Sequence, residues 1–352
     1  MSHDLEQRKD QHLDLCLNES VERRGVSPLF ENVHLLHDAL PELDLDQISL
    51  QTALLGKTLR APLLVVGMTG GTERAGLINK DLARVAQAHG LAFGVGSQRA
   101  MFVNPARAAT YQVRDVAPDV LLFGNIGAQQ IAQIGVPGVA ELVKRIEADA
   151  ICVHLNPAQE LVQTSGDRSF SGCLDSIRRL VEVLGPRVWV KETGCGISRS
   201  VAAQLVAAGV GGIDVSGAGG TSWTRVEALR GRGLQEALGE ELAGWGIPTA
   251  AAVAAVSELG VPVIASGGLR TGTDVAKALA LGATLGGMAL PFLKAHEAGG
   301  VPALEDAVRL VETALRSVLL LTGSRDVAAL RRKPRLLTGE LPRWIETLRS
   351  DV

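Results

Sequence analysis

Short apolar runs, rich in branched side chains, recur along the chain from residue 63 onward. The runs are almost uniformly apolar and do not alternate with polar residues. This pattern is typical of strands that are buried on both faces of a parallel sheet. It predicts eight strands, at residues 63–66, 91–95, 120–123, 150–155, 188–190, 212–215, 263–265 and 284–288.

Segments with helical spacing of apolar residues lie between the predicted strands. Most end at or just before a glycine, which favours the left-handed turn that stops a helix. Helices are predicted at residues 77–89, 105–116, 139–147, 174–184, 198–208, 249–259 and 273–281, with a closing helix at 304–321. Eight βα alternations over about 260 residues predict an α/β fold of the (β/α)8 TIM-barrel type. The alternative, a doubly wound sheet, favours a Gly-x-Gly-x-x-Gly fingerprint, which does not occur in the sequence.

The pattern divides the chain into three regions. Residues 1–60 are polar and lack regular spacing, so we predict an irregular N-terminal extension. Residues 61–325 form the predicted barrel with its closing helix. Residues 326–352 form a C-terminal tail to which we assign no role.

Composition and charge narrow the class of protein. Hydrophobic residues make up 46% of the chain and the formal net charge is −3, which indicates a sizeable core and excludes a general nucleic-acid coat. The uncharged run at residues 278–293 is too short and too interrupted to span a bilayer, and the N-terminus has no apolar signal region. The four cysteines lack metal-type spacing. We therefore expect a cytoplasmic protein with reduced thiols that binds neither nucleic acid nor a membrane.

Glycine-rich loops follow the seventh and eighth predicted strands. They read Ser-Gly-Gly-Leu-Arg-Thr-Gly at 266–272 and Gly-Met-Ala-Leu-Pro at 287–291. In TIM barrels the active site forms at the C-terminal ends of the strands, and this pair of loops commonly binds phosphate. Backbone N–H groups that glycine leaves accessible form an anion cradle. The pattern therefore favours a phosphate site over two plain tight turns.

Polar side chains follow the fourth predicted strand. Strand alternation places His154 and Asn156 on one face, and Gln159 and Glu160 come on the loop above them. These groups can orient a ligand, and Glu160 can hold a hard cation. Four convergent polar groups favour a functional site over a structural core histidine.

The fifth predicted strand ends in a lysine. Lys191 alternates with Trp189 and is predicted to point into the barrel mouth. A buried lysine needs an anionic partner. A flavin edge that is negative when reduced and an internal salt bridge both satisfy that need. Cys195 lies between two glycines with no base near it in the sequence, so we interpret it as a small structural residue.

An ordered series of motifs runs through the chain. It consists of Arg8-Lys9-Asp10, Gly67-Met-Thr-Gly-Gly71, Gly96-Ser-Gln-Arg99, Gly124-Asn-Ile-Gly127, His154-Leu-Asn-Pro-Ala-Gln-Glu160, Lys191-Glu-Thr-Gly-Cys-Gly-Ile-Ser198, Asp214-Val-Ser-Gly-Ala-Gly-Gly-Thr-Ser-Trp223, Ser266-Gly-Gly-Leu-Arg-Thr-Gly272 and Gly287-Met-Ala-Leu-Pro291. Each motif alone is weak. The whole set in this order resembles the type 2, FMN-dependent isopentenyl-diphosphate delta-isomerases. The resemblance extends from residue 8 to about residue 345.

The resemblance implies a function and a set of site residues. It implies an FMN-bound barrel that interconverts isopentenyl and dimethylallyl diphosphate in isoprenoid biosynthesis, with Mg2+ and with FMN reduced by NADPH or NADH. The implied FMN contacts are Met68, Thr69, Gly70, Ser97, Asn125, Lys191, Ser216, Thr221, Gly267, Gly268, Leu269, Ala289 and Leu290. The implied substrate contacts are Arg8, Lys9, Ser97, Gln98, Arg99 and Gln159, with Glu160 as the metal ligand. The implied catalytic group is Gln159, His154, Asn156 and Lys191. Ala158 and Leu269 depart from the family pattern without removing a polar group.

Two other functions fit parts of the pattern. An FMN-dependent 2-hydroxyacid oxidase needs a His/Arg pair after the sixth or seventh strand, and the loop at 216–221 contains no histidine. A non-catalytic flavin- or phosphate-binding barrel has little use for the polar set at 154–160. The resembled family tends to form tetramers, so we expect a homo-oligomer of four or more subunits.

Overall fold

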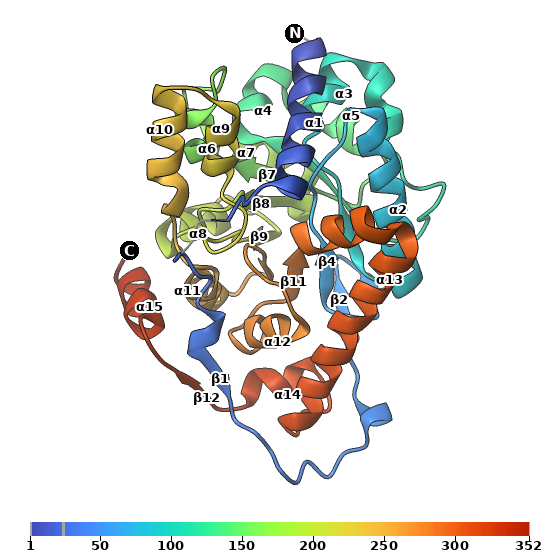
Figure 1. The fold of residues 1–352 in the computed structure, drawn as a ribbon, viewed down its shortest axis with the longest axis vertical. Helices are drawn as coiled ribbons and strands as arrows, with labels where there is room; N and C mark the ends of the chain where they lie inside the picture. The colour runs from blue at the N-terminus through green and yellow to red at the C-terminus, as the bar shows by residue number, and fades with distance from the viewer. Residues whose placement is uncertain (1, 23–24, 352) are drawn as a thin grey trace.

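The computed structural model describes residues 2–22 and 25–351 (Figure 1). Parallel strands form a closed barrel in which each strand pairs with the next along the chain, and β11 closes the ring against β4. The strands are β4 (Leu63–Val65), β5 (Ala92–Gly94), β6 (Leu121–Gly127), β7 (Ala150–Leu155), β8 (Val188–Glu192), β9 (Gly212–Asp214), β10 (Val263–Ala265) and β11 (Leu285–Met288). The predicted TIM barrel is confirmed. The third strand is longer than predicted because residues 124–127 continue the pairing with β7.

Helices surround the barrel, and the predicted ones are confirmed with one exception. The confirmed helices are α2 (Glu73–His89), α5 (Val136–Arg145), α7 (Cys173–Leu184), α8 (Arg199–Ala207), α11 (Thr249–Val256), α12 (Gly272–Ala280) and α13 (Leu290–Leu321). A further helix, α4 (Ala128–Ile134), was not predicted. The βα loops carry further helices, namely α3 (Arg99–Val103), α6 (Pro157–Val162), α9 (Trp223–Arg230) and α10 (Leu234–Glu241). Short 3-10 turns are η1 (Phe30–Asn32), η2 (Leu45–Gln47), η4 (Gly185–Arg187), η5 (Leu242–Gly244) and η6 (Ser257–Leu259).

The helix predicted at 105–116 is wrong. Only a 3-10 turn, η3 (Pro105–Thr110), forms there. Tyr111 and Val113, two residues apart, are both fully buried. A helix places such a pair on different faces, so the chain leaves helical geometry to bury both.

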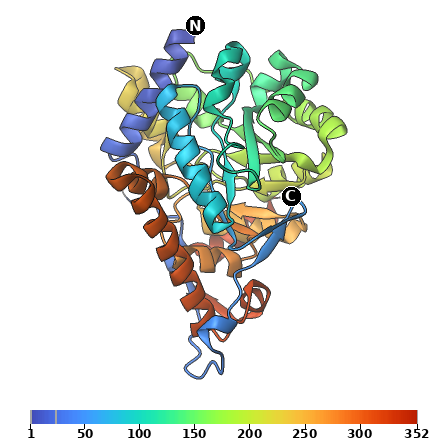
Figure 2. The same cartoon turned by 90° about the vertical axis from the view of Figure 1, so that its right-hand side faces the viewer.

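The irregular N-terminal extension is also a wrong prediction. Most of its first third is the helix α1 (Ser2–Asn18), which carries few apolar residues and therefore shows no amphipathic stripe. Leu13 and Cys16 are buried where α1 packs on α9 and α13. Figure 1 shows α1 between α9 and the α2–α3 side of the molecule, and Figure 2 shows it close to the start of α13. Docking on the barrel, rather than its own sequence pattern, stabilises this helix.

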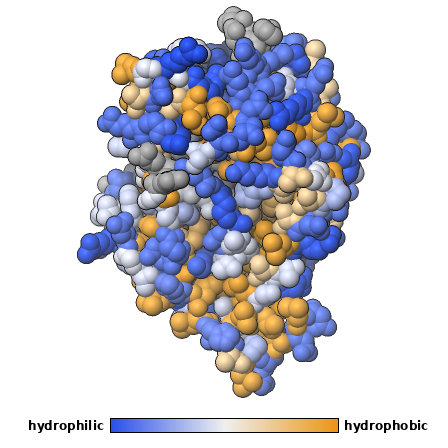
Figure 3. Space-filling view, viewed as in Figure 1, coloured by the Kyte–Doolittle hydropathy of each residue, from blue (hydrophilic) through white to orange (hydrophobic). Residues whose placement is uncertain are grey.

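The extension and the tail meet at the other end of the molecule. Strand β1 (Val33–Leu35) pairs antiparallel with β12 (Arg335–Leu337). The tail also contains α14 (Val327–Arg332) and α15 (Leu341–Ser350), which pack on α12 and α11 respectively. On the face shown in Figure 3, apolar residues lie among polar ones over the lower half. In the described part of the chain, no helix combines the length and apolar character that crossing a membrane requires.

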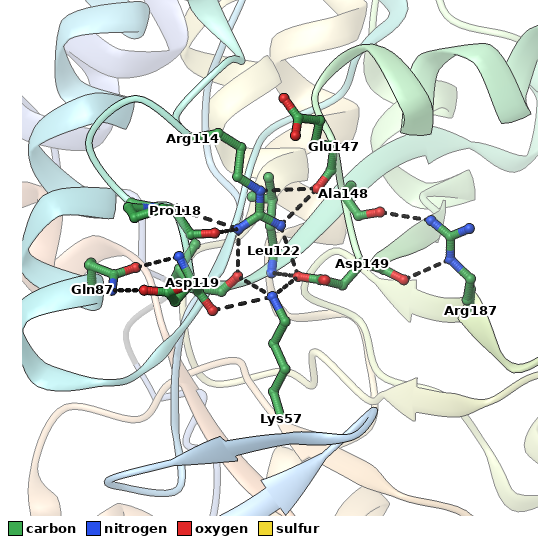
Figure 4. Close-up of polar contacts among 12 residues, drawn as sticks. Lys57, Gln87, Arg114, Pro118, Asp119, Leu122, Glu147, Ala148, Asp149 and Arg187 are labelled. Atoms are coloured by element: carbon green, nitrogen blue, oxygen red, sulfur yellow. Dashed lines mark hydrogen bonds and ion pairs between the residues drawn. The ribbon is translucent and has the colours of Figure 1, made fainter.

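A hairpin closes the N-terminal end of the barrel. Strands β2 (Thr52–Leu54) and β3 (Lys57–Leu59) place Leu54 and Leu59 against the apolar side chains inside the barrel. Lys57 Nζ donates to Asp149 Oδ2 at 2.9 Å, and Arg114 and the Leu122 N–H donate to the same oxygen (Figure 4). Burial opposes ionisation of Asp149, but these donors outweigh it and hold the pKa of the carboxyl below its usual range. With this end closed, ligands reach the barrel from the C-terminal ends of the strands.

Candidate active site

A cavity opens at the C-terminal ends of the barrel strands, with α1 forming part of its wall. Most of the residues singled out in the sequence line it together. They are Arg8, Lys9, Met68, Thr69, Ser97, Arg99, Asn125, His154, Asn156, Gln159, Glu160, Lys191, Ser216, Thr221, Gly267, Gly268, Ala289 and Leu290. The cavity therefore joins the N-terminal extension to both glycine-rich loops.

Gln98, Leu269 and Gly70 lie outside this lining. The Gln98 amide is fully buried, accepts from the Asn125 N–H and donates to Leu142 O, both at 3.0 Å. Leu269 belongs to the apolar core. Gly70 packs on the ring of Tyr111. The structure thus gives these residues roles in holding the lining residues in place, and does not bring the Gln98 or Leu269 side chain to the cavity.

The two glycines after β10 are required by the backbone. Gly267 and Gly268 have φ of +96° and +83°, in the left-handed region that favours glycine. A Cβ on Gly267 would lie 2.2 Å from Gly217 O, and one on Gly268 would lie 2.6 Å from Gly219 O. The loop after β10 therefore packs directly on the loop after β9. Neither glycine carries a side chain, so the backbone of this loop reaches the cavity wall directly, which suits a phosphate group.

Lys191 reaches the barrel mouth as predicted, and it is 6% exposed. Its Nζ donates to Glu192 O at 2.5 Å, and among the described residues no carboxylate lies within ion-pair distance of it. Asp214 is its neighbour in the strand register. The buried Asp214 carboxylate accepts from Ser266 Oγ at 2.6 Å and from the Ser216 N–H at 3.2 Å. Burial raises the pKa of Asp214, and the positive charge of Lys191 opposes that rise. Lys191 thus has donor capacity left for an anionic ligand in the cavity.

The loop after β8 is shaped by a carboxylate. Glu192 Oε2 accepts from the N–H groups of Thr193, Gly194 and Cys195 at 2.5–2.6 Å. Burial raises the pKa of Glu192 to about 7 in spite of these bonds. Burial also raises the pKa of the Cys195 thiol, to about 12, which agrees with a structural cysteine rather than a nucleophile.

His154 is a neutral imidazole. Burial, together with the charges of Lys191, Lys9 and Arg99, lowers the pKa of His154 to about 3. Its Nδ1 lies 2.8 Å from Asn125 Oδ1, which can only accept, so Nδ1 carries the proton and donates. Nε2 is left as a hydrogen-bond acceptor at the cavity wall.

Asn156 and Glu160 form a hydrogen-bonded pair. Asn156 Nδ2 donates to Glu160 Oε1 at 2.9 Å, and the Asp167 N–H donates to Glu160 Oε2 at 2.7 Å. In residues 2–22 and 25–351, no cluster of three or more His, Cys, Asp or Glu side chains is arranged to hold a metal. A cation at Glu160 would need its other ligands from a bound substrate and water, which is how Mg2+ is commonly held beside phosphates.

The sequence did not reveal a second carboxylate beside Gln159. Glu227 Oε1 lies 3.1 Å from Gln159 Nε2 and 2.9 Å from His12 Nε2, and Arg230 Nη1 donates to Glu227 Oε2 at 2.5 Å. Burial opposes ionisation, but the bonds and charges of His12 and Arg230 and the Gln159 amide lower the pKa of Glu227 to about 2. One signal was available: His12 follows Arg8 by four residues and so shares its face of α1.

Positive charge gathers at the α1 side of the cavity. Arg8 lies near Arg99, and its Nε is buried with no hydrogen-bond partner among the described residues. Burial lowers the pKa of Arg8, and the charge of Arg99 lowers it further, while Glu227 opposes both. A buried guanidinium with an unused donor beside a second arginine is an arrangement that an anionic ligand completes.

Comparison with known proteins defines the class first. The FMN-dependent dehydrogenase family model matches residues 102–337. A solved mandelate oxidase variant with a C4a-OH-FMN adduct is similar in fold, with a TM-score of 0.64 at 20% identity over 95% of this chain and 99% of that chain. The match and the glycine cradle place the chain among the flavin-dependent barrels.

Curated relatives define the family within that class. A protein of Synechococcus sp. is 48% identical over 93% of this chain and 95% of its own length, and one of Nostoc sp. is 45% identical over 94% and 95%. A protein of Methanosarcina barkeri is 45% identical over 94% of this chain and 92% of its own length. All three are named isopentenyl-diphosphate delta-isomerase. The chain belongs to the isopentenyl-diphosphate delta-isomerase family.

Proposed function

We propose that this protein interconverts isopentenyl and dimethylallyl diphosphate, using reduced FMN in acid–base chemistry. The observation that carries the proposal is the division of the cavity. Its α1 side holds Arg8, with an unused buried donor, beside Arg99. Its barrel wall holds Lys191 and the glycine cradle. Such a cavity suits a diphosphate held from α1 and a flavin held by the barrel loops.

FMN fits the residues on the cradle side. Gly267 and Gly268 would receive its phosphate, and Ser97, Asn125, Ser216 and Lys191 offer polar atoms along the rest of the wall. When bound and reduced, FMN supplies an electron-rich ring with a protonatable nitrogen. The charge of Lys191 favours the negatively charged reduced form.

Arg8, Arg99 and the cation on Glu160 would bind the diphosphate. Charge-assisted hydrogen bonds from guanidinium groups to phosphate oxygens are strong and geometrically specific. Mg2+ at Glu160 would neutralise further negative charge. Fixing the diphosphate positions the apolar tail, which offers no polar group to hold.

The isomerisation adds a proton at the terminal alkene carbon and removes another from the carbon next to the one that bears the diphosphate. Positive charge develops in between, so the site must exclude water. Leu13, Met288 and Leu293 supply apolar lining to the cavity. Gln159, which donates a hydrogen bond to Glu227, would orient the alkene. The Nε2 acceptor of His154 and the Asn156 side chain would supply the remaining polar groups on this part of the cavity wall.

We further propose that NADPH or NADH keeps the flavin reduced and that the protein forms a homo-oligomer of four or more subunits. Reductant preference is measured by following flavin bleaching with each nucleotide under anaerobic conditions. The oligomer is measured by light scattering of the FMN-loaded protein.

The test of the function is a turnover experiment in D2O. With FMN, Mg2+ and one equivalent of reductant, many turnovers of isopentenyl diphosphate are expected, with deuterium entering a methyl group of the product. NADPH consumption that matches product formation, or product free of deuterium, would refute acid–base chemistry on the flavin. Oxidation of lactate-type acids with no isomerisation would instead support a 2-hydroxyacid oxidase.

A further inference from the structure

One buried hydroxyl connects the N-terminal helix to the barrel. Tyr111 is the single tyrosine of the chain and is fully buried. Its Oη donates to Ser97 O at 2.7 Å and accepts from Lys9 Nζ at 2.6 Å. Tyr111 does not line the cavity, so it acts on the site through Lys9 and Ser97.

Lys9 uses every donor of its ammonium group on the protein. Besides Tyr111, its Nζ donates to Ser97 O at 3.0 Å and to Gly70 O. These acceptors belong to the loops after β4 and β5 and to the segment after η3. Burial, with the charge of Arg8, lowers the pKa of Lys9 to about 7. When protonated, the amine has three donors and no acceptor, so none is left for a phosphate oxygen in this arrangement. In this structure Lys9 therefore fastens α1 to the barrel.

The phenol ring is enclosed as closely as its hydroxyl. A Cβ on Gly70 would lie 2.1 Å from Tyr111 Cε1, and one on Gly71 would lie 3.1 Å from Tyr111 Oη. The loop after β4 thus folds directly on the ring. Burial raises the pKa of Tyr111, so the hydroxyl keeps the proton that it donates to Ser97 O.

Most other polar contacts of α1 in the described region are more exposed. Asp14 pairs with Arg74, and both side chains are at least 40% exposed. Glu6 pairs with Arg107, and Asp10 accepts from Thr72 Oγ1 at 2.8 Å. Exposed ion pairs contribute about 0–1 kcal/mol each. The buried contacts of Lys9 and of His12 therefore hold α1 together with the buried Leu13 and Cys16, and Lys9 directly follows Arg8.

We propose that Tyr111 is a positioning residue for the diphosphate half of the site. Its hydroxyl holds Lys9, Lys9 holds α1, and α1 presents the unpaired Nε of Arg8 beside Arg99. The role in catalysis rests on the proposed isomerase function, whereas the contact itself does not.

The first test observes the contact without catalysis. Because Tyr111 is the single tyrosine, biosynthetic 3-fluorotyrosine gives the FMN-loaded protein one 19F resonance. Lys9→Met removes the ammonium and is expected to shift that resonance. Gln7→Ala, at an exposed neighbouring position of α1, is the matched control and is expected to leave it in place. A resonance that is the same in Lys9→Met and in the unmodified sequence overturns the proposal.

The second test removes only the hydroxyl. Tyr111→Phe keeps the ring against Gly70, so the barrel and its flavin spectrum are expected to stay unchanged. Loss of one hydrogen bond to a charged group should speed amide hydrogen exchange in α1 about tenfold. For the same reason, the KM for isopentenyl diphosphate should rise about tenfold, while kcat stays within twofold of that of the unmodified protein. Unchanged exchange, or a fall in kcat at constant KM, would contradict the positioning role. Absence of isomerase activity in the unmodified protein would refute the proposed function, while the resonance and exchange would still decide the contact.

Discussion

Glu227→Gln tests the buried network beside Gln159. The side chain of Glu227 is 1% exposed, and its two oxygens accept from His12, Gln159 and Arg230. A glutamine has one oxygen and one NH2 group. Whichever way it is turned, its NH2 group faces either Arg230 or the other two donors, so at least one hydrogen bond is lost and a donor is left facing a donor.

The pKa gives the magnitude. The carboxyl has an ordinary pKa of 4.5 and a pKa of about 2 in the folded protein. That difference corresponds to about 3 kcal/mol of folding free energy, present above pH 4.5 and lost as the pH falls through about 2. The sign follows because the folded state holds the proton less tightly than the unfolded chain. Near pH 3 about half of the stabilisation, roughly 1.4 kcal/mol, should remain.

The assay is guanidinium denaturation of the FMN-loaded protein at fixed FMN concentration, at pH 7 and at pH 3. The free energy of unfolding of Glu227→Gln should be about 3 kcal/mol below that of the unmodified sequence at pH 7, and the gap should narrow at pH 3. Glu236→Gln, at an exposed position of α10, is the control and should change stability by less than about 0.5 kcal/mol. A gap of the same size at both pH values would show that ionisation of Glu227 is not its source.

Three further variants test the ligand sites. Gly267→Ala should weaken FMN binding, measured by calorimetry, because its Cβ would meet Gly217 O. Gly260→Ala is the control: no atom lies within 4 Å of its new Cβ, so it should lower stability through the backbone but leave FMN affinity unchanged. Equal FMN affinities in the two variants would argue against the cradle. Glu160→Gln should shift the Mg2+ dependence of activity to much higher concentration with FMN still bound, and a titration that overlays the unmodified protein would remove the metal assignment. Lys191→Ala should lower kcat and loosen reduced FMN more than oxidised FMN, and an equal loss of both affinities would disprove pairing with the reduced ring.

The barrel was predictable because its strands are buried on both faces. Uniform apolar runs such as 63–66 leave little ambiguity, and a glycine after most of the predicted helices marks the unit length. Helix α1 was not predictable in this way, because it is stabilised by contacts with helices more than 200 residues later in the chain. The helix prediction at 105–116 failed because the buried Tyr111 packs against the loops after β4 and β5 and does not form part of an apolar helix face.

The site was predictable where side-chain chemistry follows a strand directly, as at His154, Asn156 and Lys191. Glu227 was missed because its partner His12 is 215 residues away, and no local spacing connects them. Gln98 is the opposite case, a residue that the sequence singles out but whose side chain does not reach the cavity. Its place in a motif suggests a ligand contact, but only the structure shows that its amide is used up on Asn125 and Leu142.

The pairing of β1 with β12 sets an order of events during synthesis. Residues 33–35 leave the ribosome early, but the strand that pairs with them spans residues 335–337. Helix α1 likewise waits for α9 and α13 before it has a surface to pack on. The barrel can close around its apolar interior while the N-terminal segment is still without its partners. The cationic wall of the cavity therefore cannot be complete before the start of α13 has been made, directly after the last barrel strand, whereas β1 gains its partner only later, from β12.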